Sequence, residues 1–132
     1  MNLKNDIFYS GYYPVDNLSG QDMFYMLFES RNNRHSDPLI IWLRGEQGCS
    51  ASADLFSEMG PYQFKVNETT GGIPQMSHNP HSWNGFANLL IVDAQIGTGY
   101  SFVRGDSKTG AWKMDLHVKY FVRFMKQFLA QH

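Results

Sequence analysis

Residues 38–51 read Pro-Leu-Ile-Ile-Trp-Leu-Arg-Gly-Glu-Gln-Gly-Cys-Ser-Ala and carry the strongest structural signal in the sequence. The apolar run at 39–43 is short, rich in β-branched side chains and introduced by a proline, which predicts a buried strand. The glycine-containing turn after it leads into residues 51–58, for which we predict a helix. Such a turn gathers free backbone N–H groups that suit a developing negative charge. A plain strand-to-helix turn is the alternative, because short glycine motifs are weak signals.

Composition limits the class of protein. The 132 residues suffice for one domain with a core, and 42% apolar with 17% charged residues indicates a globular chain. A formal net charge of −1 gives no electrostatic reason to expect a nucleic acid or an anionic membrane as partner. No stretch reaches the length of a membrane span, and the first residues lack the apolar core of a signal peptide.

The first half of the chain predicts strands on either side of the opening stretch. Residues 7–15 and 22–29 are apolar runs joined by a turn, so we expect a hairpin, with Gly11 as a candidate bulge. Residues 62–66 alternate like a short edge strand. Residues 67–87 are rich in turn-forming residues and predict a long loop.

The second half predicts a strand followed by a helix. Residues 88–93 form the clearest buried strand, which we expect to run parallel to 38–43 because another element intervenes. A turn at 97–102 follows the strand, and residues 111–131 show helical periodicity. The residues expected to face the core are Met114, Val118, Phe121, Met125, Phe128 and Leu129. A hairpin followed by strand–helix–strand–helix is an α/β pattern.

Four stretches, in the same order along the chain, resemble the N-terminal part of the serine carboxypeptidases. They are residues 10–12 with 24–30, 37–43 with 45 and 48–50, 58–62 with 79–84, and 88–93 with 97–102. The joint match covers most of residues 10–105 and is highly specific. It implies a partial α/β-hydrolase fold with a mixed, mostly parallel sheet, in which residues 1–132 are a single incomplete domain.

The resemblance also implies roles for the loop after the first long apolar run. The family's loop reads Asn-Gly-Gly-Pro-Gly-Cys-Ser-Ser, and here residues 44–51 read Arg-Gly-Glu-Gln-Gly-Cys-Ser-Ala. By position, the backbone of Gly45 and Glu46 would line the oxyanion hole, and Arg44 with Gly45 would hold the substrate carboxylate. An arginine can bind a carboxylate through paired charge-assisted hydrogen bonds, whereas a Glu46 carboxylate would oppose an oxyanion. A solvated Arg44–Glu46 pair without a function is the alternative.

The catalytic triad is not found in this sequence. The family's nucleophile lies in a Gly-x-Ser-x-Gly elbow, and no serine here has that surrounding; Ser101 and Ser107 have only the first glycine. The resemblance implies that the nucleophile, acid, base and a disulfide partner for Cys49 lie downstream. The histidines lack the spacing of a zinc site, so we predict no metal and no cofactor. They are His35, His78, His81, His117 and His132.

The resemblance implies a serine-type carboxypeptidase, which releases C-terminal residues from peptides. We expect this N-terminal segment to be inactive alone, with a peptide substrate and the missing C-terminal portion of the fold as its partners. The alternative is a non-catalytic carboxypeptidase-like protein that binds through Arg44 and the aromatic segment around Trp83. The family implies the secretory pathway, a vacuole or lysosome, or the extracellular space, where Asn17 and Asn67 would be candidate glycosylation sites. Without a signal peptide, the location stays open.

Overall fold

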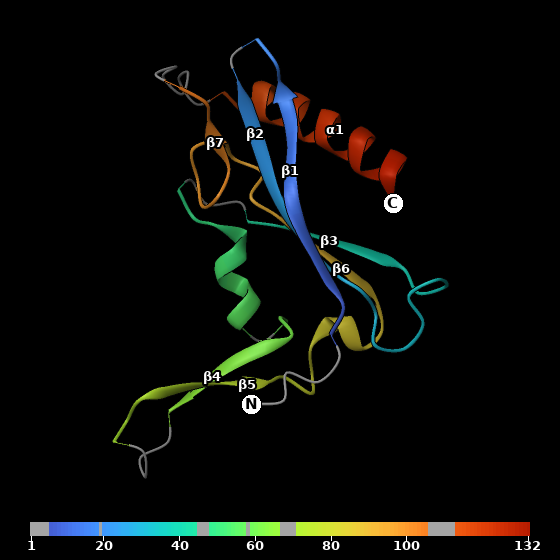
Figure 1. Ribbon diagram of the computed structural model, residues 1–132, viewed down its shortest axis with the longest axis vertical. Helices are drawn as coiled ribbons and strands as arrows, with labels where there is room; N and C mark the ends of the chain where they lie inside the picture. The colour runs from blue at the N-terminus through green and yellow to red at the C-terminus, as the bar shows by residue number, and fades with distance from the viewer. Residues whose placement is uncertain (1–5, 19, 45–47, 58, 67–70, 106–112) are drawn as a thin grey trace.

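The computed structural model describes residues 6–18, 20–44, 48–57, 59–66, 71–105 and 113–132 (Figure 1). Its main sheet has the strand order β1-β2-β6-β3, and a short strand β7 pairs with the start of β2. The strands are β1 (Phe8–Asp16), β2 (Gln21–Phe28), β3 (Leu39–Leu43), β6 (Asn88–Val92) and β7 (Phe102–Val103). The mixed sheet and the α/β class agree with the prediction. Only β3 and β6 run parallel among the described pairs, however, so the expected mostly parallel character is not found there.

The predicted hairpin is formed by β1 and β2, which pair antiparallel. The bulge expected at Gly11 was wrong, because Gly11 pairs in register with Tyr25 and the register shifts between Pro14 and Asp16. A β-carbon at Gly11 would lie 3.3 Å from Cε1 of Tyr25. The glycine therefore makes room for the tyrosine ring.

Strand β3 is parallel to β6, as predicted, but it is not a buried strand. Leu39, Ile41 and Leu43 are 38%, 38% and 41% exposed. The exposure follows from the position of β3. Within the described residues β3 is an edge strand that pairs with β6 alone. Helix α1 (Met114–Gln131) packs near the opposite edge of the sheet, against β1. An apolar run does not reveal whether a strand has a neighbour on one side or on two.

Two further predictions are corrected in the middle of the chain. The helix expected at 51–58 is a six-residue 3₁₀ helix, η1 (Ala51–Phe56). The predicted strand β4 (Tyr62–Val66) forms a separate two-stranded sheet with β5 (Pro74–His78). Strand β5 and a short turn of 3₁₀ helix, η3 (Trp83–Gly85), lie in the segment expected to be a loop, because pairing with β4 gives its backbone a partner that the local sequence does not indicate.

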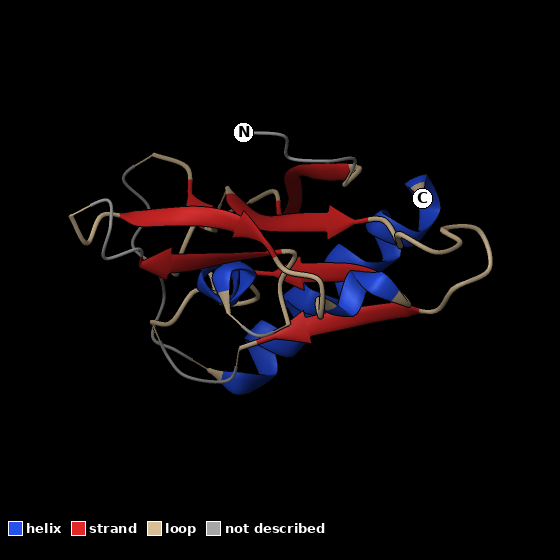
Figure 2. Cartoon of the chain, turned by 90° about the horizontal axis from the view of Figure 1, so that it is seen from below, coloured by secondary structure: helices blue, strands red, loops and turns tan. Residues whose placement is uncertain are grey.

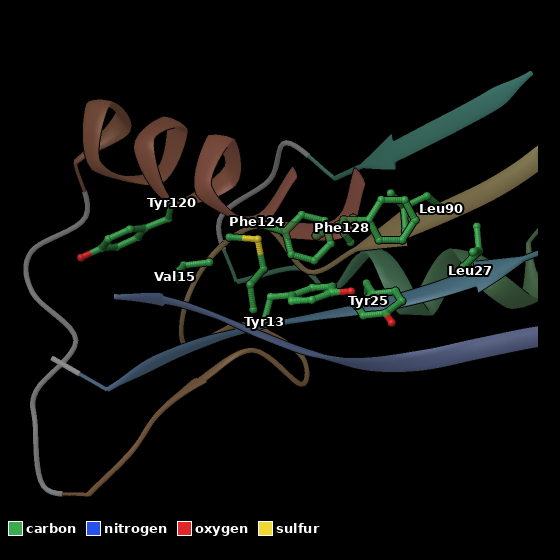
Figure 3. Packing of buried hydrophobic residues seen from close by; sticks show 10 residues of the cluster. Tyr13, Val15, Tyr25, Leu27, Leu90, Tyr120, Phe124 and Phe128 are labelled. Carbon is green, nitrogen blue, oxygen red and sulfur yellow. The ribbon is translucent and has the colours of Figure 1, made fainter. Parts of the chain in front are cut away.

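Helix α1 covers one face of the sheet through an aromatic stripe (Figure 3). Tyr120, Phe124 and Phe128 are buried against side chains of β1, β2 and β6, among them Tyr13 and Tyr25. Of the six residues predicted to face the core, Phe128 is buried and Phe121 and Met125 pack against the core cluster, whereas the prediction was wrong for the other three. Met114, Val118 and Leu129 are 58%, 54% and 63% exposed, and Phe121 and Met125 are partly buried. The helix carries two apolar stripes, and the bulkier aromatic one packs on the sheet.

The opposite face of the sheet carries a second core cluster. Phe28, Leu89 and Ile91 pack there against Ala51, Leu55 and Met59, which come from η1 and the segment after it. Figure 2 shows the strands in red together with the helical segments in blue. The two clusters bury β6 on both faces, which fits its continuous apolar sequence.

Candidate functional site

The candidate site lies where two neighbouring parallel strands end. Leu43 pairs with Val92 at the ends of β3 and β6, so Arg44 and Asp93 begin two loops at one edge of the sheet. In open α/β sheets, this carboxyl edge is where ligands bind. The loop that carries the predicted oxyanion-hole and carboxylate residues therefore begins at a suitable place.

Asp54 of η1 holds the start of the first loop. Its Oδ2 accepts a hydrogen bond from Nε1 of Trp42 at 2.8 Å, and its Oδ1 accepts one from Nη1 of Arg44 at 3.0 Å. The Arg44 side chain is 34% exposed, so it stays open to solvent while its direction is set by Asp54. Arg44 thus has an acidic partner other than the Glu46 that the sequence suggested. Its role as a carboxylate ligand stays a prediction.

The other predicted site residues are placed as follows. Gly45 and Glu46 lie outside the described residues, as does Asn67. Asn17 is exposed in the β1–β2 turn, and Cys49 is half-buried with no disulfide to any described residue. Their predicted roles in the oxyanion hole, glycosylation and a disulfide therefore stay predictions.

The second loop is connected to the first through Asp93, which sequence reasoning did not single out. The Asp93 carboxylate accepts a hydrogen bond from Oγ of Ser50 at 2.8 Å, and Oε1 of Gln95 accepts one from the Gly48 N–H at 3.4 Å. Asp54 was also missed. The signal for Asp93 was an acidic residue directly after a fully apolar strand, where only a set of hydrogen-bond donors can compensate for burial.

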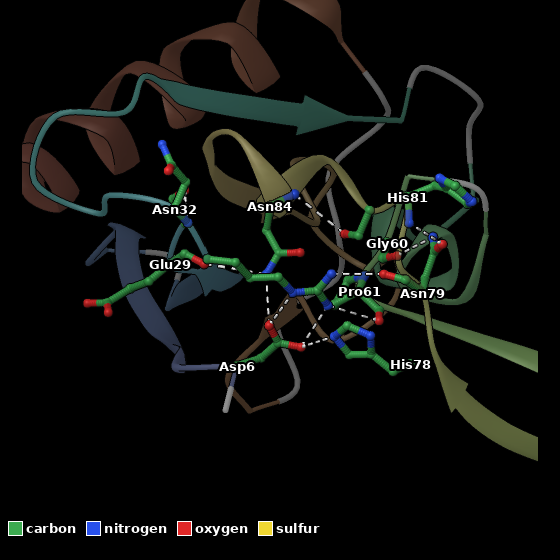
Figure 4. Close-up of polar contacts among 12 residues, drawn as sticks. Asp6, Glu29, Asn32, Gly60, Pro61, His78, Asn79, His81 and Asn84 are labelled. Carbon is green, nitrogen blue, oxygen red and sulfur yellow. Dashed lines mark hydrogen bonds and ion pairs between the residues drawn. The ribbon is translucent and has the colours of Figure 1, made fainter. Parts of the chain in front are cut away.

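A second polar network surrounds the carboxylate of Asp6, with Asn84 and His78 close to it (Figure 4). Asp6 accepts hydrogen bonds from Nε and Nη2 of Arg31 at 2.7 and 2.9 Å and from Nδ2 of Asn84 at 3.1 Å. Arg31 also donates to the backbone oxygens of Asn79 and Pro61, which links the main sheet to the segments that flank β4 and β5.

This environment lowers the pKa of Asp6. Burial by itself would raise it, but hydrogen bonds from Arg31 and Asn84 and the charge of Arg31 outweigh burial, holding the pKa below its ordinary 3.8. Nε2 of His78 lies 3.7 Å from the carboxylate. We interpret this network as structural, because Arg31 joins the Asp6 carboxylate to the backbone oxygens of Asn79 and Pro61.

The aromatic segment around Trp83 packs inward. The Trp83 ring meets the Trp42 ring edge-on, with centroids 5.7 Å apart, and both rings are partly buried against the second core cluster. In the part of the chain that the structure describes, no three His, Cys, Asp or Glu side chains are arranged to hold a metal ion. No described helix is long and apolar enough to span a membrane.

Comparison with known proteins identifies the relatives of this chain. A family profile described as serine carboxypeptidase matches residues 3–132. Serine carboxypeptidase S10 family member 1 of Dictyostelium discoideum is 37% identical over 93% of this chain and 28% of its own length. Carboxypeptidase Y homolog A of Pyrenophora tritici-repentis is 37% identical over 91% of this chain and 21% of its own length.

A solved structure confirms the fold. A prohormone-processing carboxypeptidase from Saccharomyces cerevisiae, Kex1(delta)p, superposes with a TM-score of 0.67 and 24% identity, covering 93% of this chain and 27% of that one. This chain spans less than a third of the length of the relatives cited here.

Proposed function

We propose that this chain, which belongs to the serine carboxypeptidase family, is the N-terminal portion of a peptidase that releases C-terminal residues from peptides. The observation that carries the proposal is the place where the loop that follows β3 begins, at Arg44. This family-like loop leaves β3 beside the end of β6, at the edge of the sheet where such folds bind ligands.

In the complete enzyme, a serine hydroxyl would attack the scissile carbonyl while a histidine accepts its proton. The peptide C–N bond would then break, the C-terminal residue would leave with that proton on its amine, and water would hydrolyse the acyl-enzyme. This chain would supply part of the substrate site and one side of the oxyanion hole, through the backbone of Gly45 and Glu46. The triad would come from the rest of the polypeptide. We therefore propose that residues 1–132 are an incomplete domain without peptidase activity of their own.

The outer side of β3 supports this division. Ile41 and its neighbours in β3 leave apolar surface exposed, and β3 has a partner strand on one side only among the described residues. A further strand that pairs there in parallel would end at the same edge as β3. A nucleophile following that strand would face the loop that begins at Arg44.

The experiment compares the purified 132-residue chain with the native polypeptide from its source, using an N-blocked dipeptide and a serine-directed fluorophosphonate. We expect the native polypeptide to contain a Gly-x-Ser-x-Gly elbow, to trim the dipeptide and to lose activity on labelling. The 132-residue chain should do none of these. Trimming by the pure short chain, or an unreactive native polypeptide, would contradict the proposal.

Arg44 would select substrates with a free C-terminal carboxylate. Its guanidinium group is held by Asp54 at the end of β3 and still exposed, which suits a paired interaction with a carboxylate. In the active polypeptide, Arg44→Gln should raise KM for a peptide acid by about 10- to 100-fold, the range for a lost charged hydrogen bond. The KM for the matching peptide amide should stay unchanged.

Arg34→Gln is the control for that substitution, because Arg34 is exposed and pairs with Glu29 in a different loop. It should leave KM unchanged for both peptides. Equal effects of Arg44→Gln on the acid and the amide would rule out carboxylate recognition by Arg44.

A non-catalytic role is the second candidate, and the exposure of Arg44 within the described residues favours it. In that case, the 132-residue chain would bind peptide acids and not peptide amides. Isothermal titration calorimetry of the short chain with both peptides separates the two functions. Trp83, which is partly buried against the second core cluster, would contribute less of the binding surface than Arg44.

A further inference from the structure

Asp93 is a buried carboxylate that the proposed chemistry does not use. It is 2% exposed and follows directly on the last residue of β6. An ionised side chain so deeply buried is costly unless hydrogen bonds compensate for its lost hydration. The donors around Asp93 therefore show what the residue is for.

Those donors come from both loops of the candidate site. From the first loop, Oγ of Ser50 donates to Oδ1 at 2.8 Å, and the backbone N–H and Oγ of Ser52 donate to Oδ1 and Oδ2 at 3.3 Å each. From the second loop, the Tyr100 N–H donates to Oδ2 at 3.0 Å. The carboxylate thus joins its own loop to a segment that lies more than 40 residues away in sequence.

The backbone of Asp93 is fixed to the sheet. Its N–H donates to the carbonyl oxygen of Phe24 in β2 at 3.1 Å. Oγ of Ser101 donates to the Asp93 carbonyl oxygen at 2.6 Å and accepts the Phe24 N–H at 2.8 Å. The backbone of Asp93 is therefore fixed to the sheet, while its carboxylate oxygens accept hydrogen bonds from the two loops.

Space around the carboxylate is tight. Gly99 has a φ of +58°, and a β-carbon there would overlap Oδ2 of Asp93 and Oγ of Ser50. Only glycine lets the second loop come this close while adopting a left-handed conformation. Backbone conformation and hydrogen bonding thus specify the same arrangement of the two loops.

We propose that Asp93 is a positioning residue, whose carboxylate fixes the loop that follows β3 against the loop that follows β6. This inference rests on the proposed function, because the first loop is the one predicted to carry the oxyanion-hole donors. Donors that stabilise a transition state must be held in place before the reaction, and a displacement of about 1 Å can lower the rate about 100-fold. Asp93 would thus act on kcat without touching the substrate.

Asp93→Asn tests the proposal, because the amide has the same shape but replaces one acceptor oxygen with a donor. In the active polypeptide, we expect kcat to fall about 100-fold, while KM for a peptide acid changes less than about threefold. Ser50→Ala should lower kcat less. Because Ser50 acts through Asp93, the double substitution should be no worse than Asp93→Asn alone.

Asp22→Asn is the matched control. Asp22 is a buried carboxylate, 1% exposed, whose ion-pair partner is Arg104, a residue beyond the two loops. It should leave kcat unchanged in the folded protein. If kcat falls equally in both variants, the loss in Asp93→Asn is explained by general destabilisation, and the proposal is overturned.

Hydrogen exchange on the 132-residue chain provides a readout independent of activity. The amides of Ser52 and Tyr100 should exchange about tenfold faster or more in Asp93→Asn, while that of Leu90 in β6 keeps its rate. Unchanged exchange at both loop amides would overturn the proposal.

The two proposals fail in different ways. An active parent polypeptide whose Asp93→Asn variant keeps its kcat within twofold would overturn the positioning role alone. An inactive parent would contradict the proposed function, and the positioning role would fall with it, whatever hydrogen exchange shows.

Discussion

At the scale of single residues, the candidate site depends on two carboxylates with different tasks. Asp54 is partly exposed and directs Arg44 from the 3₁₀ helix that follows the first loop, whereas Asp93 is buried and joins two loops that are distant in sequence. Glycines in the loops of this chain are required for different reasons. Some are needed only because their backbone is left-handed, whereas at Gly99 a β-carbon would also overlap the Asp93 carboxylate.

Gly99→Ala should therefore destabilise the chain more than an alanine at a glycine that has only the backbone requirement. Gly71 has a φ of +74°, and a β-carbon added there would meet nothing within 4 Å, so Gly71→Ala should cost about 1–2 kcal/mol. Gly99→Ala should cost about 1–3 kcal/mol more, because it adds an overlap. Urea denaturation of both variants measures the difference, and equal losses would show that the loops yield without cost.

At the scale of elements, α1 has two apolar stripes that differ in burial. Its aromatic stripe is buried on the sheet, and its aliphatic stripe is largely exposed. The stability of the element should therefore depend mainly on the aromatic side chains.

Phe124→Ala tests this at a fully buried position of α1. It should lower the free energy of unfolding by about 3–5 kcal/mol, the usual cost of removing a buried phenylalanine. Val122→Ala is the control on the same helix, at a side chain that is 47% exposed, and should cost less than about 1 kcal/mol. Comparable losses from both would mean that the exposed stripe also packs in the folded chain.

Strand β3 carries a risk of self-association, because an apolar strand with an open edge is a template for another chain. Ile41 lies outside the second core cluster and is 38% exposed, so Ile41→Lys should reduce association with little loss of fold. Sedimentation velocity of the 132-residue chain is the measurement. A parent chain that is monomeric at high concentration would show that the edge is protected in solution.

At the scale of the whole molecule, the ion pair between Asp6 and Arg31 joins the N-terminal segment to both sheets. Since the pKa of Asp6 is lower in the folded chain than its ordinary 3.8, the carboxylate stabilises the fold above that pH. This contribution is lost as the pH falls below 3.8 through the folded pKa.

Asp6→Asn should destabilise the chain at pH 7 and flatten the dependence of stability on pH between about 5 and 2. Unfolding by urea at several pH values measures both effects. Asp115→Asn, at an exposed position in the first turn of α1, is the control and should keep the parent's dependence. A parallel loss of stability with acid in Asp6→Asn and the parent would assign that dependence to other groups.

Local sequence was sufficient for the elements whose own side chains specify them. The hairpin, the buried strand β6, its parallel partner β3 and the helix near the C-terminus were all predictable, because apolar runs and helical periodicity are short-range signals. The site loop could be placed at the end of β3 because its motif follows that strand directly in sequence. The position of a strand in a sheet and the packed stripe of a helix depend on neighbours. The burial of β3 was therefore predicted wrongly, the core face of α1 was predicted only in part, and β5 was missed.

The sequence by itself thus determined the family, the order of most elements and the residues predicted to meet the substrate. Tertiary structure alone decided that Asp54 pairs with Arg44, that Asp93 joins two loops, and that Asp6 is buried against Arg31. The physical reason is that local sequence can mark a carboxylate as buried, as for Asp93 after β6, without showing which groups pair with it. Its role depends on which donors the fold brings within hydrogen-bond distance, and for Asp93 those donors lie up to 43 residues away.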